Sequence, residues 1–498
     1  MIDYLKFKSG TDIRGVAVEG VPGELVNLTD EALCAMTDGF LCWLCEKLGR
    51  PATDLTVSVG HDSRISAQRI KTAVVNTLCD RGVAVYDCGL SSTPAMFMTT
   101  VLADCDAAVQ ITASHHPFNR NGLKFFTRDG GLSGGDITAI LLNAQSGRRQ
   151  PTAAGSVGPL AFMEQYAAHL RQMIVDSTGE QQPFSGMRII VDAGNGAGGF
   201  YAYDVLRPLG ADITGSQFLE PDGRFPNHIP NPENQQAMDS ARAATVQAGA
   251  QLGIIFDTDV DRAGCVDQAG NEINRNRLVA LAAAIALQGH PGATVVTDSV
   301  TSAGLKTFIE QQLGGRHHRF KRGYKNVIDE AVRLNADGID APLAIETSGH
   351  AAFSENYFLD DGAYLITKIL IQMVLLRRQG KTIDDLIAGL QEPAEAVELR
   401  FNILDNDFKS AGQAVIDGLF GYADRPGWTV APDNYEGIRV SLGSGWFLLR
   451  LSVHDPIMPL NIESDTPGGT VEIARALYGY LQGCNQLDLT PIQAFLQQ

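Results

Sequence analysis

The sequence has no apolar run long enough to cross a membrane. Its longest uninterrupted one, LVALAAAIAL at 278–287, is about half of the ~20 residues that a transmembrane helix needs. The first residues, MIDYLKFKSGTD, lack the basic stretch followed by an apolar one that marks a secretory signal. We therefore expect a cytoplasmic protein that has no membrane partner.

Cysteine is sparse, with eight residues dispersed over a chain of 498. Cys42 and Cys45 form a C-x-x-C pair, but a zinc or redox site would require a second pair or a thioredoxin-like βαβ context, and neither is visible. We interpret these two thiols as buried, small apolar side chains on one face of a helix. The cysteine pattern thus indicates a reduced protein.

Cations are scarce relative to anions. Lysine and arginine number 39 against 57 aspartates and glutamates, which gives a formal net charge of −18 at pH 7. A polyanionic partner would be repelled, so nonspecific binding of nucleic acid is excluded. A small anionic substrate is not excluded, because it needs only a locally basic pocket. Heptad repeats and low-complexity tracts are also absent, and 44% hydrophobic with 19% charged residues is typical of a globular protein.

One plan repeats along the chain: an apolar, β-prone run, then a polar or glycine-rich turn, then a helical pattern. Buried runs that alternate with helices predict parallel or mixed sheets in α/β domains. The polar residues fall where each strand would end, which is the edge at which open α/β sheets bind ligands. The segments with this plan are 54–64, 187–199, 251–262, 293–302 and 341–350.

The length is too great for one hydrophobic core and suggests three or four domains. Residues 143–159 are rich in Gly, Ser, Pro and Ala and read as a linker, and a second join is expected after Arg262. Beyond 377–396 the pattern becomes strand-rich, which indicates a separate α+β domain. We predict four domains, at 1–150, 151–262, 263–390 and 391–498.

The segment DTDVDR carries three closely spaced carboxylates, those of Asp257, Asp259 and Asp261. In an extended chain, residues at i, i+2 and i+4 point to one side, where their charges repel one another unless a cation lies between them. Hard oxygen ligands of this kind suit Mg²⁺. An EF-hand is excluded, because Arg262 stands where Gly is needed and Gln268 where Glu is needed. A solvated acidic turn is the alternative, but the apolar run LGIIF directly before the cluster favours a metal site.

The segment VDAGNGAGG at 191–199 satisfies the G-x-G-x-x-G pattern with Gly194, Gly196 and Gly199, and Asp212 follows at the end of a possible next strand. Such a turn could bind a pyrophosphate. The motif is short and glycine is abundant in this chain, so a tight structural turn is the favoured interpretation. A dinucleotide-dependent oxidoreductase remains an alternative that titration with NAD(H) would test.

Two further polar groups follow apolar runs. In IETSGH, Glu346, Thr347 and Ser348 could bind the hydroxyls of a polyhydroxylated ligand, although a helix N-cap explains the hydroxyls equally well. In RLSVHDP, a predicted strand carries Arg450, Ser452 and His454 on one face. Together they could clamp a phosphate, or they could be exposed polar side chains of a sheet. Arg14, in the loop FKSGTDIRG, could also reach a phosphate.

Ser114 follows the apolar run 106–112 in the segment TASHHP. A base-activated nucleophile is disfavoured, because the G-x-S-x-G elbow is missing and His115 and His116, as sequence neighbours, are poorly placed to bond back to the serine oxygen. A serine that carries a phosphoryl group requires a metal and positive charge instead, and the chain offers both. A serine hydrolase remains the alternative, which a fluorophosphonate label would support.

In this order, the motifs resemble those of the α-D-phosphohexomutase family over essentially the whole chain. TASHHP is similar to the family's phosphoserine loop (commonly TASHNP), DTDVDR to its metal loop (DGDxDR) and IETSGH to its sugar loop (GExSGH), while GTDIRG and PDGRFPNHIPNPE add further matches. The resemblance implies three related mixed α/β domains followed by a smaller α+β C-terminal domain around a central cleft. The last domain would act as a mobile lid.

The resemblance also implies roles for individual residues. Ser114 would be the phosphorylated residue, and one Mg²⁺ per chain would bind its phosphate together with Asp257, Asp259 and Asp261. Glu346 and Ser348 would hold the sugar's hydroxyls. The distal phosphate would be held by Arg450, Ser452 and His454. The transferring group would be surrounded by Arg14, Lys124, Arg262 and His350, of which Lys124 and His350 are candidates for proton transfer.

The implied activity is a reversible intramolecular phosphoryl transfer between the 1- and 6-positions of a hexose phosphate, as in phosphomannomutases and phosphoglucomutases. It would proceed through phospho-Ser114 and a hexose 1,6-bisphosphate, which would also be the activator. A phosphoglucosamine mutase or a non-catalytic sugar-phosphate-binding protein are alternatives. Two departures from the family's pattern bear on the substrate. The family's phosphate loop usually reads R-x-S-G/N-T-E-P, whereas this chain has RLSVHDP, and Thr347 occupies the variable position of the sugar loop. A monomer or homodimer is expected.

Overall fold

The computed structural model describes residues 2–147, 154–443, 445–452 and 455–497 of the chain. They form two compact units, one of residues 1–286 and 342–387 and one of residues 287–341 and 388–498. Among the described residues, no helix has both the length and the apolar character of a membrane span. All eight cysteines are described and are free thiols. Cys42 and Cys45 lie on one helix but are only half-buried, so the prediction that both are buried is wrong.

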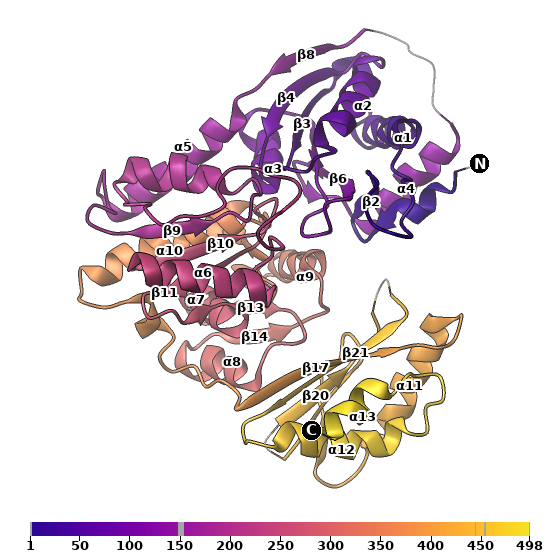
Figure 1. Cartoon of the computed structure of the whole chain (residues 1–498), viewed down its shortest axis with the longest axis vertical. Helices are drawn as coiled ribbons and strands as arrows, with labels where there is room; N and C mark the ends of the chain where they lie inside the picture. Colours follow the sequence, from indigo (N-terminus) through magenta and orange to yellow (C-terminus); the bar gives the residue numbers. More distant parts are fainter. Residues whose placement is uncertain (1, 148–153, 444, 453–454, 498) are drawn as a thin grey trace. The chain divides into compact units, whose positions relative to one another are not determined.

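The N-terminal part of the first unit is built on an eight-stranded mixed sheet with the strand order β1-β2-β6-β5-β3-β4-β8, and β7 pairs with β6 (Figure 1). Its strands are β1 (Lys8–Ser9), β2 (Asp12–Val16), β3 (Thr56–His61), β4 (Ala84–Leu90), β5 (Ala107–Ile111), β6 (Arg120–Thr127), β7 (Gly130–Gly131) and β8 (Ser156–Pro159). Its helices are η1 (Tyr4–Phe7), α1 (Asp30–Leu48), η2 (Ala52–Asp54), α2 (Ala67–Cys79), α3 (Thr93–Leu102) and α4 (Gly134–Gln145).

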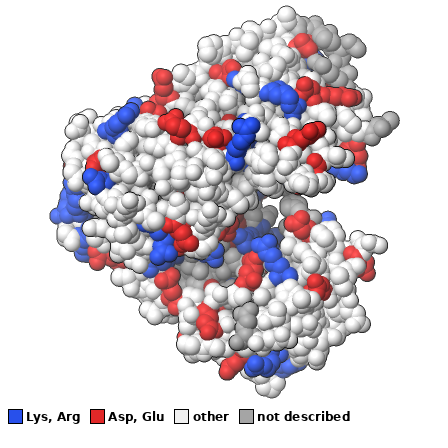
Figure 2. Space-filling model, in the orientation of Figure 1, with Lys and Arg blue, Asp and Glu red and all other residues white. Residues whose placement is uncertain are grey.

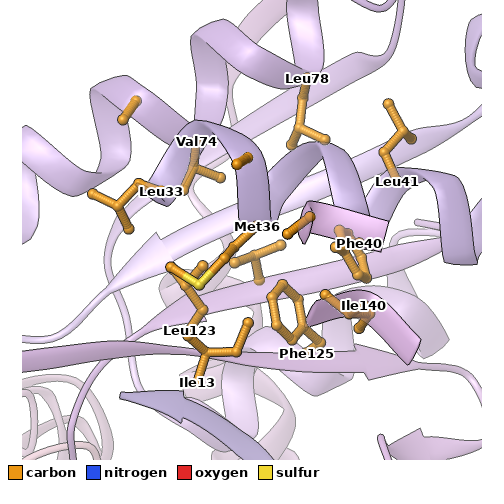
Figure 3. Packing of buried hydrophobic residues seen from close by; sticks show 14 of the residues in the cluster. Ile13, Leu33, Met36, Phe40, Leu41, Val74, Leu78, Leu123, Phe125 and Ile140 are labelled. Atoms are coloured by element: carbon orange, nitrogen blue, oxygen red, sulfur yellow. The ribbon is translucent and has the colours of Figure 1, made fainter. Parts of the chain in front are cut away.

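One face of this sheet is covered by α1, α2 and α4, which share a hydrophobic core with it (Figure 3). The rings of Phe40 on α1 and Phe125 on β6 stack with their centroids 4.4 Å apart, and Leu123 packs into the same core. Because side chains alternate along a strand, Lys124, between Leu123 and Phe125, points to the opposite face. The helix α3 covers that face, where Phe97 meets Phe126 edge-on.

The rest of the first unit contains a second sheet, with the order β12-β11-β10-β9, in which β9 and β10 are parallel and the other pairs antiparallel. Its strands are β9 (Ile189–Asp192), β10 (Leu252–Phe256), β11 (Ala263–Asp267) and β12 (Glu272–Ile273). The antiparallel pair β15 (Leu343–Ile345) and β16 (Ala351–Phe353) also belongs to this unit. The helices here are α5 (Phe162–Thr178), η3 (Tyr201–Leu206), η4 (Arg207–Leu209), α6 (Gln235–Ala248), α7 (Arg275–Gly289), η6 (Ser354–Asn356), α10 (Gly362–Arg377) and η7 (Ile383–Leu386).

The second unit contains the parallel pair β13 (Thr294–Thr297) and β14 (Arg316–Arg319) and a five-stranded antiparallel sheet with the order β17-β21-β20-β19-β18. The strands of that sheet are β17 (Glu395–Asn402), β18 (Trp428–Val430), β19 (Ile438–Leu442), β20 (Gly445–Leu449) and β21 (Ile457–Ser464). The helices of the unit are α8 (Ala303–Thr307), η5 (Phe308–Gln312), α9 (Tyr324–Ala336), α11 (Phe408–Ala423), α12 (Gly469–Leu481) and α13 (Thr490–Leu496).

The strand–turn–helix plan read from the sequence is therefore present, and the strand-rich C-terminal segment is an antiparallel sheet with helices, as predicted. The four domain boundaries remain a prediction, because the two compact units divide the chain differently. On the face shown in Figure 2, acidic and basic side chains are interspersed.

Candidate active site

The candidate site is built where the parallel strands β3, β4 and β5 end at one edge of the first sheet. Three loops follow these strands: Asp62 and Arg64 come after β3, Thr93 begins α3 after β4, and Ser114 comes after β5. Ligand sites of open α/β sheets form at this carboxyl edge, so the topology gathers polar side chains that lie far apart in the sequence.

Ser114 is buried and adopts a left-handed backbone conformation with φ of 50°. Its backbone N–H donates to Thr112 Oγ1 at 2.9 Å. Its Oγ donates to Asp257 Oδ2 at 3.1 Å and accepts from Arg262 Nη2 at 2.8 Å, although more than 140 residues separate the serine from both partners. The structure thus brings together Ser114 and the DTDVDR segment.

The structure also places His115 within reach of the serine, with Nδ1 3.3 Å from Ser114 Oγ. The prediction that the neighbouring histidines are poorly placed to bond back to the serine oxygen is therefore wrong for His115. The same Nδ1 atom contacts Arg262 Nη2, which is a donor, so Nδ1 is the acceptor of that bond. Burial, and then the charge of Arg262, lower the pKa of His115. Its lone pair is engaged and its basicity is low, so the ring is poorly suited to take a proton from the serine.

The acidic loop follows β10 directly and is closed by a backbone bond from Asp257 N to Arg262 O. The carboxylates of Asp257, Asp259 and Asp261 are buried, and their oxygens lie within 4.8 Å of one another. Burial, and then the charge of Asp261, raise the pKa of Asp257 well above its usual range. Burial also acts to raise the pKa of Asp261, but the positive charges of Lys124, and then of His350 and Arg262, outweigh it and hold this pKa below its usual value.

The hydrogen bonding of these carboxylates leaves oxygens that a divalent cation could bind. Asp259 Oδ1 and Asp261 Oδ1 are buried and accept no hydrogen bond from any described residue. The second oxygen of each contacts Lys124 Nζ, at 3.0 Å in the case of Asp259. A buried oxygen without a donor is costly, and three converging carboxylates are the hard donor set that Mg²⁺ and similar ions prefer. The donor set therefore fits a metal ion, with Lys124 beside it.

A residue that sequence reasoning missed holds the acidic loop in place. Thr93 N donates to the carbonyl of Asp259 at 2.8 Å, and Thr93 Oγ1 donates to its carboxylate. Thr93 is the first residue of α3, and the side chain of Ser92 caps that helix. The segment SSTPA reads as a helix start in the sequence, but only the fold shows that the start of this helix meets Asp259.

His350 is paired with Asp360, another residue that the sequence analysis did not name. His350 Nδ1 bonds to Asp360 Oδ2, and Asp360 Oδ1 accepts from Ala351 N at 3.1 Å. Burial opposes the charged imidazole, but Asp360, and then Asp261, raise the pKa of His350 to about 9. An isolated bridge joins the backbones of Arg262 and His350, so the histidine lies beside the acidic loop.

Glu346 and Ser348 are buried in the short connection between β15 and β16, where Ser348 Oγ donates to Glu346 Oε2 at 3.3 Å. The connection is closed by Glu346 N bonding to His350 O at 2.9 Å. A strand rather than a helix follows, so the N-cap interpretation of Thr347 and Ser348 is wrong. Gly349 has φ of 94°, and a Cβ there would lie 2.6 Å from the carbonyl oxygen of Ala263, so this close approach to β11 requires glycine.

Arg14 lies on β2, opposite Gly122 of β6, and its guanidinium pairs with Asp12 at 2.8 Å. Burial, and then the charge of Arg14, lower the pKa of His116 to about 3. Arg14 is therefore close enough to the Ser114 loop to act on it electrostatically.

The predicted phosphate clamp belongs to the second unit. Arg450 is buried directly after β20, which ends at Leu449. Arg450 N donates to Pro459 O at 3.1 Å and Ser452 N to Ile457 O at 3.0 Å, which continues the register in which β20 pairs with β21. That Arg450, Ser452 and His454 alternate to one face stays a prediction. His454 lies outside the described residues.

The glycine segment 191–199 forms a turn after β9 and not a dinucleotide cradle. Asn195 and Gly194 have positive φ values, and a Cβ at Gly196 would lie 2.5 Å from the carbonyl oxygen of Thr258 in the acidic loop. The carboxylate of Asp192 accepts from Gly194 N at 2.9 Å. The carboxylate of Asp192 therefore already occupies the turn, and its negative charge would repel a pyrophosphate. The segment supports the acidic loop.

Comparison with known proteins defines the class. The chain matches the family models described as phosphoglucomutase/phosphomannomutase, alpha/beta/alpha domain I over residues 6–148, domain II over 164–270 and domain III over 274–393. A solved phosphoglucomutase/phosphomannomutase family protein from Burkholderia thailandensis is 26% identical, with a TM-score of 0.79, and the match covers 97% of this chain and 98% of that one. The predicted fold class of three α/β domains and a smaller C-terminal domain is confirmed.

Proteins of similar sequence carry names of the same family. A phosphomannomutase/phosphoglucomutase of Pseudomonas putida is 30% identical over 82% of this chain and 84% of its own length. A phosphoglucomutase of Neisseria gonorrhoeae is 31% identical over 91% and 92%, and a phosphomannomutase of Salmonella typhimurium is 30% identical over 82% and 87%. The fold and these matches define an isomerase, a phosphohexomutase. The chain belongs to the phosphoglucomutase/phosphomannomutase family, as the order of its motifs predicted.

Proposed function

We propose that the enzyme interconverts the 1- and 6-phosphates of glucose and mannose by way of phospho-Ser114 and a hexose 1,6-bisphosphate. The observation that carries this proposal is the environment of Ser114 Oγ, which bonds to a carboxylate of the buried acidic triad and to Arg262. This arrangement suits a serine that carries a phosphoryl group beside a metal. The names of the relatives, phosphoglucomutase and phosphomannomutase, support the choice of sugars.

In the first half-reaction, the bond between Ser114 Oγ and phosphorus breaks while a bond forms from phosphorus to the free 1- or 6-oxygen of the sugar. The sugar hydroxyl gives up its proton, and the serine oxygen that leaves phosphorus takes one; Lys124 and His350 are the candidates for these proton transfers. With its pKa raised to about 9, His350 is protonated at neutral pH and would donate to the serine oxygen. The resulting bisphosphate reorients so that its other phosphate faces Ser114, and Ser114 takes that phosphoryl group by the reverse step. Phosphoryl transfer of this kind depends mainly on positioning and on charge stabilisation.

The chain's own residues would supply most of that stabilisation. Asp257, Asp259 and Asp261 would hold one Mg²⁺, which would neutralise charge on the transferring group. Arg262 already donates to the serine oxygen and would follow the charge as it develops. Glu346 and Ser348 would bind the sugar's hydroxyls, and Arg14 would add positive charge. The second phosphate would be held by Arg450, Ser452 and His454 in the second unit.

A coupled mutase assay tests the proposal. We expect turnover of glucose-1-phosphate and mannose-1-phosphate with Mg²⁺ and glucose 1,6-bisphosphate as primer, and slower turnover of glucosamine-1-phosphate. Faster turnover of glucosamine-1-phosphate would favour the phosphoglucosamine mutase alternative. Binding of the sugar phosphates without any turnover would favour a non-catalytic binding protein. A monomeric or dimeric state and a cytoplasmic location remain predictions from the sequence.

Replacing Asp360 by asparagine is expected to lower the pKa of His350 from about 9, because burial would no longer be opposed by this carboxylate. Asparagine can still accept from Ala351 N, so the fold should be kept. We expect kcat to fall by up to about 10²-fold, within the range of proton-transfer contributions. The imidazole pKa is measured by the pH dependence of its NMR signal, assigned with His350→Gln.

The pair of His290 and Asp340 offers a matched control, because His290 Nδ1 bonds to Asp340 in the second unit with both side chains exposed. Asp340→Asn should leave kcat unchanged. An unchanged pKa of His350 together with an unchanged kcat in Asp360→Asn would show that Asp360 does not act through the histidine.

A further inference from the structure

Arg64 is a buried arginine whose side chain is fully inaccessible to solvent, and none of the roles above involves it. It follows β3 at the edge of the first sheet where the site lies. A buried guanidinium is costly unless its donors are satisfied, so its partners indicate what it does.

The guanidinium of Arg64 donates to four backbone carbonyls of the loop that carries the serine. Nη1 bonds to the carbonyl oxygens of Pro117 and Arg120, both at 2.8 Å. Nη2 bonds to those of Ser114 and His116, the latter at 2.6 Å. These oxygens converge on one point and would repel one another without a cation between them. The rigid, planar fork of arginine can serve all four, whereas the single ammonium of lysine cannot.

Asp62 extends this arrangement to the other side of Ser114. Its Oδ1 accepts from Arg64 N at 2.9 Å, and its Oδ2 lies 3.3 Å from Arg64 Nε. Oδ2 also accepts from Thr112 Oγ1 at 2.7 Å, and Thr112 Oγ1 accepts from Ser114 N at 2.9 Å. The N–H and the C=O of Ser114 are therefore both held by one ion pair.

That double attachment is needed because Ser114 is in a strained conformation. A left-handed φ is unfavourable for a residue other than glycine, and the surrounding contacts must offset its cost. With φ at 50°, Ser114 Oγ reaches Asp257 and Arg262.

A second segment covers Arg64. A Cβ at Gly223 would lie 2.4 Å from Ser63 O and 2.5 Å from Arg64 Cα, so the chain at 222–225 rests directly on the backbone of the arginine. The ring of Phe225 lies over the guanidinium, 5.3 Å from Cζ. The segment PDGRFPNHIPNPE, to which the site chemistry assigns no role, thus shields the cation from water and strengthens its bonds to the serine loop.

We propose that Arg64 is a positioning residue that aims Ser114 Oγ at the acidic loop, acting with Asp62 and Thr112 and without touching the substrate. The inference rests on the proposed function, because it concerns the rate at which Ser114 gains and loses a phosphoryl group. A displacement of about 1 Å at the reacting atom is enough to lower a rate about 10²-fold. The effect should fall on the chemical step, because no substrate contact is removed.

Arg64→Lys and Thr112→Val test the proposal from the two sides of Ser114. We expect Arg64→Lys to lower kcat about 10²-fold and Thr112→Val about 10-fold, with KM changed much less than kcat in both. Phosphorylation of Ser114 by glucose 1,6-bisphosphate, followed by intact mass and ³¹P NMR, should slow in parallel. Hydrogen exchange should rise at residues 112–120. Arg81→Lys is the matched control, because Arg81 pairs with Asp38 in the same unit away from Ser114, and it should keep the wild-type kcat.

Wild-type kcat and phosphorylation rates in a folded Arg64→Lys would overturn the proposal. If Arg64→Lys does not fold, Thr112→Val decides: a wild-type kcat there assigns Arg64 a purely structural role, and a selective loss of kcat supports the positioning role. Wild-type enzyme without any mutase turnover would instead refute the proposed function. The two failures are therefore distinct.

Discussion

Replacing Ser114 by alanine is expected to abolish mutase activity, by about 10⁴-fold or more, because the group that carries the phosphoryl moiety is removed. The fold should survive, since Asp257 and Arg262 remain paired with each other at 3.1 Å once the serine oxygen is gone. The measurement is the coupled assay with glucose-1-phosphate, Mg²⁺ and bisphosphate primer, together with ³¹P NMR of the isolated protein.

Ser114→Gly provides a second inactive variant with a different stability. Glycine adopts the left-handed conformation of position 114 without penalty, so Ser114→Gly should be about 1 kcal/mol more stable than Ser114→Ala. Ser133→Ala, which removes the N-cap of α4, should cost about 1 kcal/mol and keep full activity. Full activity in Ser114→Ala, or phosphate found on another residue, would contradict the proposed mechanism.

Removal of divalent metal by EDTA is expected to stop turnover, and Mg²⁺ is expected to restore it. Asp259→Asn should lower kcat by roughly 10³-fold, since the metal supplies several kcal/mol of charge stabilisation in such sites. Asp259 is the informative position because one of its buried oxygens accepts no hydrogen bond from any residue in the described part of the chain, whereas Thr93 holds the other.

Thermal unfolding reports metal binding independently of activity. At a Mg²⁺ concentration of about 100 times Kd, binding to the folded state alone adds about 2.7 kcal/mol of stability, so Mg²⁺ should raise Tm of the wild type and not of Asp259→Asn. Asp267→Asn is the control, because Asp267 is buried in the same unit but binds the backbone N–H groups of Ala269 and Asn271. An equal rise of Tm in the wild type and Asp259→Asn would place the metal elsewhere.

Much of the fold could be predicted because its signals are local. Apolar runs followed by turns and helical patterns mark β3, β9, β10, β13 and β15 in the sequence, and the runs are the buried strands of the structure. The kinds of residue in the candidate site could also be predicted, since three carboxylates at alternate positions directly after an apolar run favour a bound cation over a solvated turn. The family followed from the order of these motifs.

The errors arose where the local pattern ends. The hydroxyls of IETSGH predict a helix cap equally well, and only the pairing of β15 with β16 excludes it. The sequence predicts that His115 is poorly placed to bond back to Ser114, and it does not show the left-handed φ of the serine, with which Nδ1 lies 3.3 Å from the serine oxygen.

The sequence by itself determined the class of domain, the ligand types of the acidic loop and the serine that matches the family's phosphoserine motif. Only the tertiary structure decided that Ser114 lies against Asp257, that Asp360 pairs with His350, and that Arg64 donates hydrogen bonds to the backbone carbonyls of the serine loop. The reason is physical. Periodicity and turn chemistry act over a few residues, whereas these contacts join segments whose proximity depends on strand register and on how helices and loops pack against the sheets.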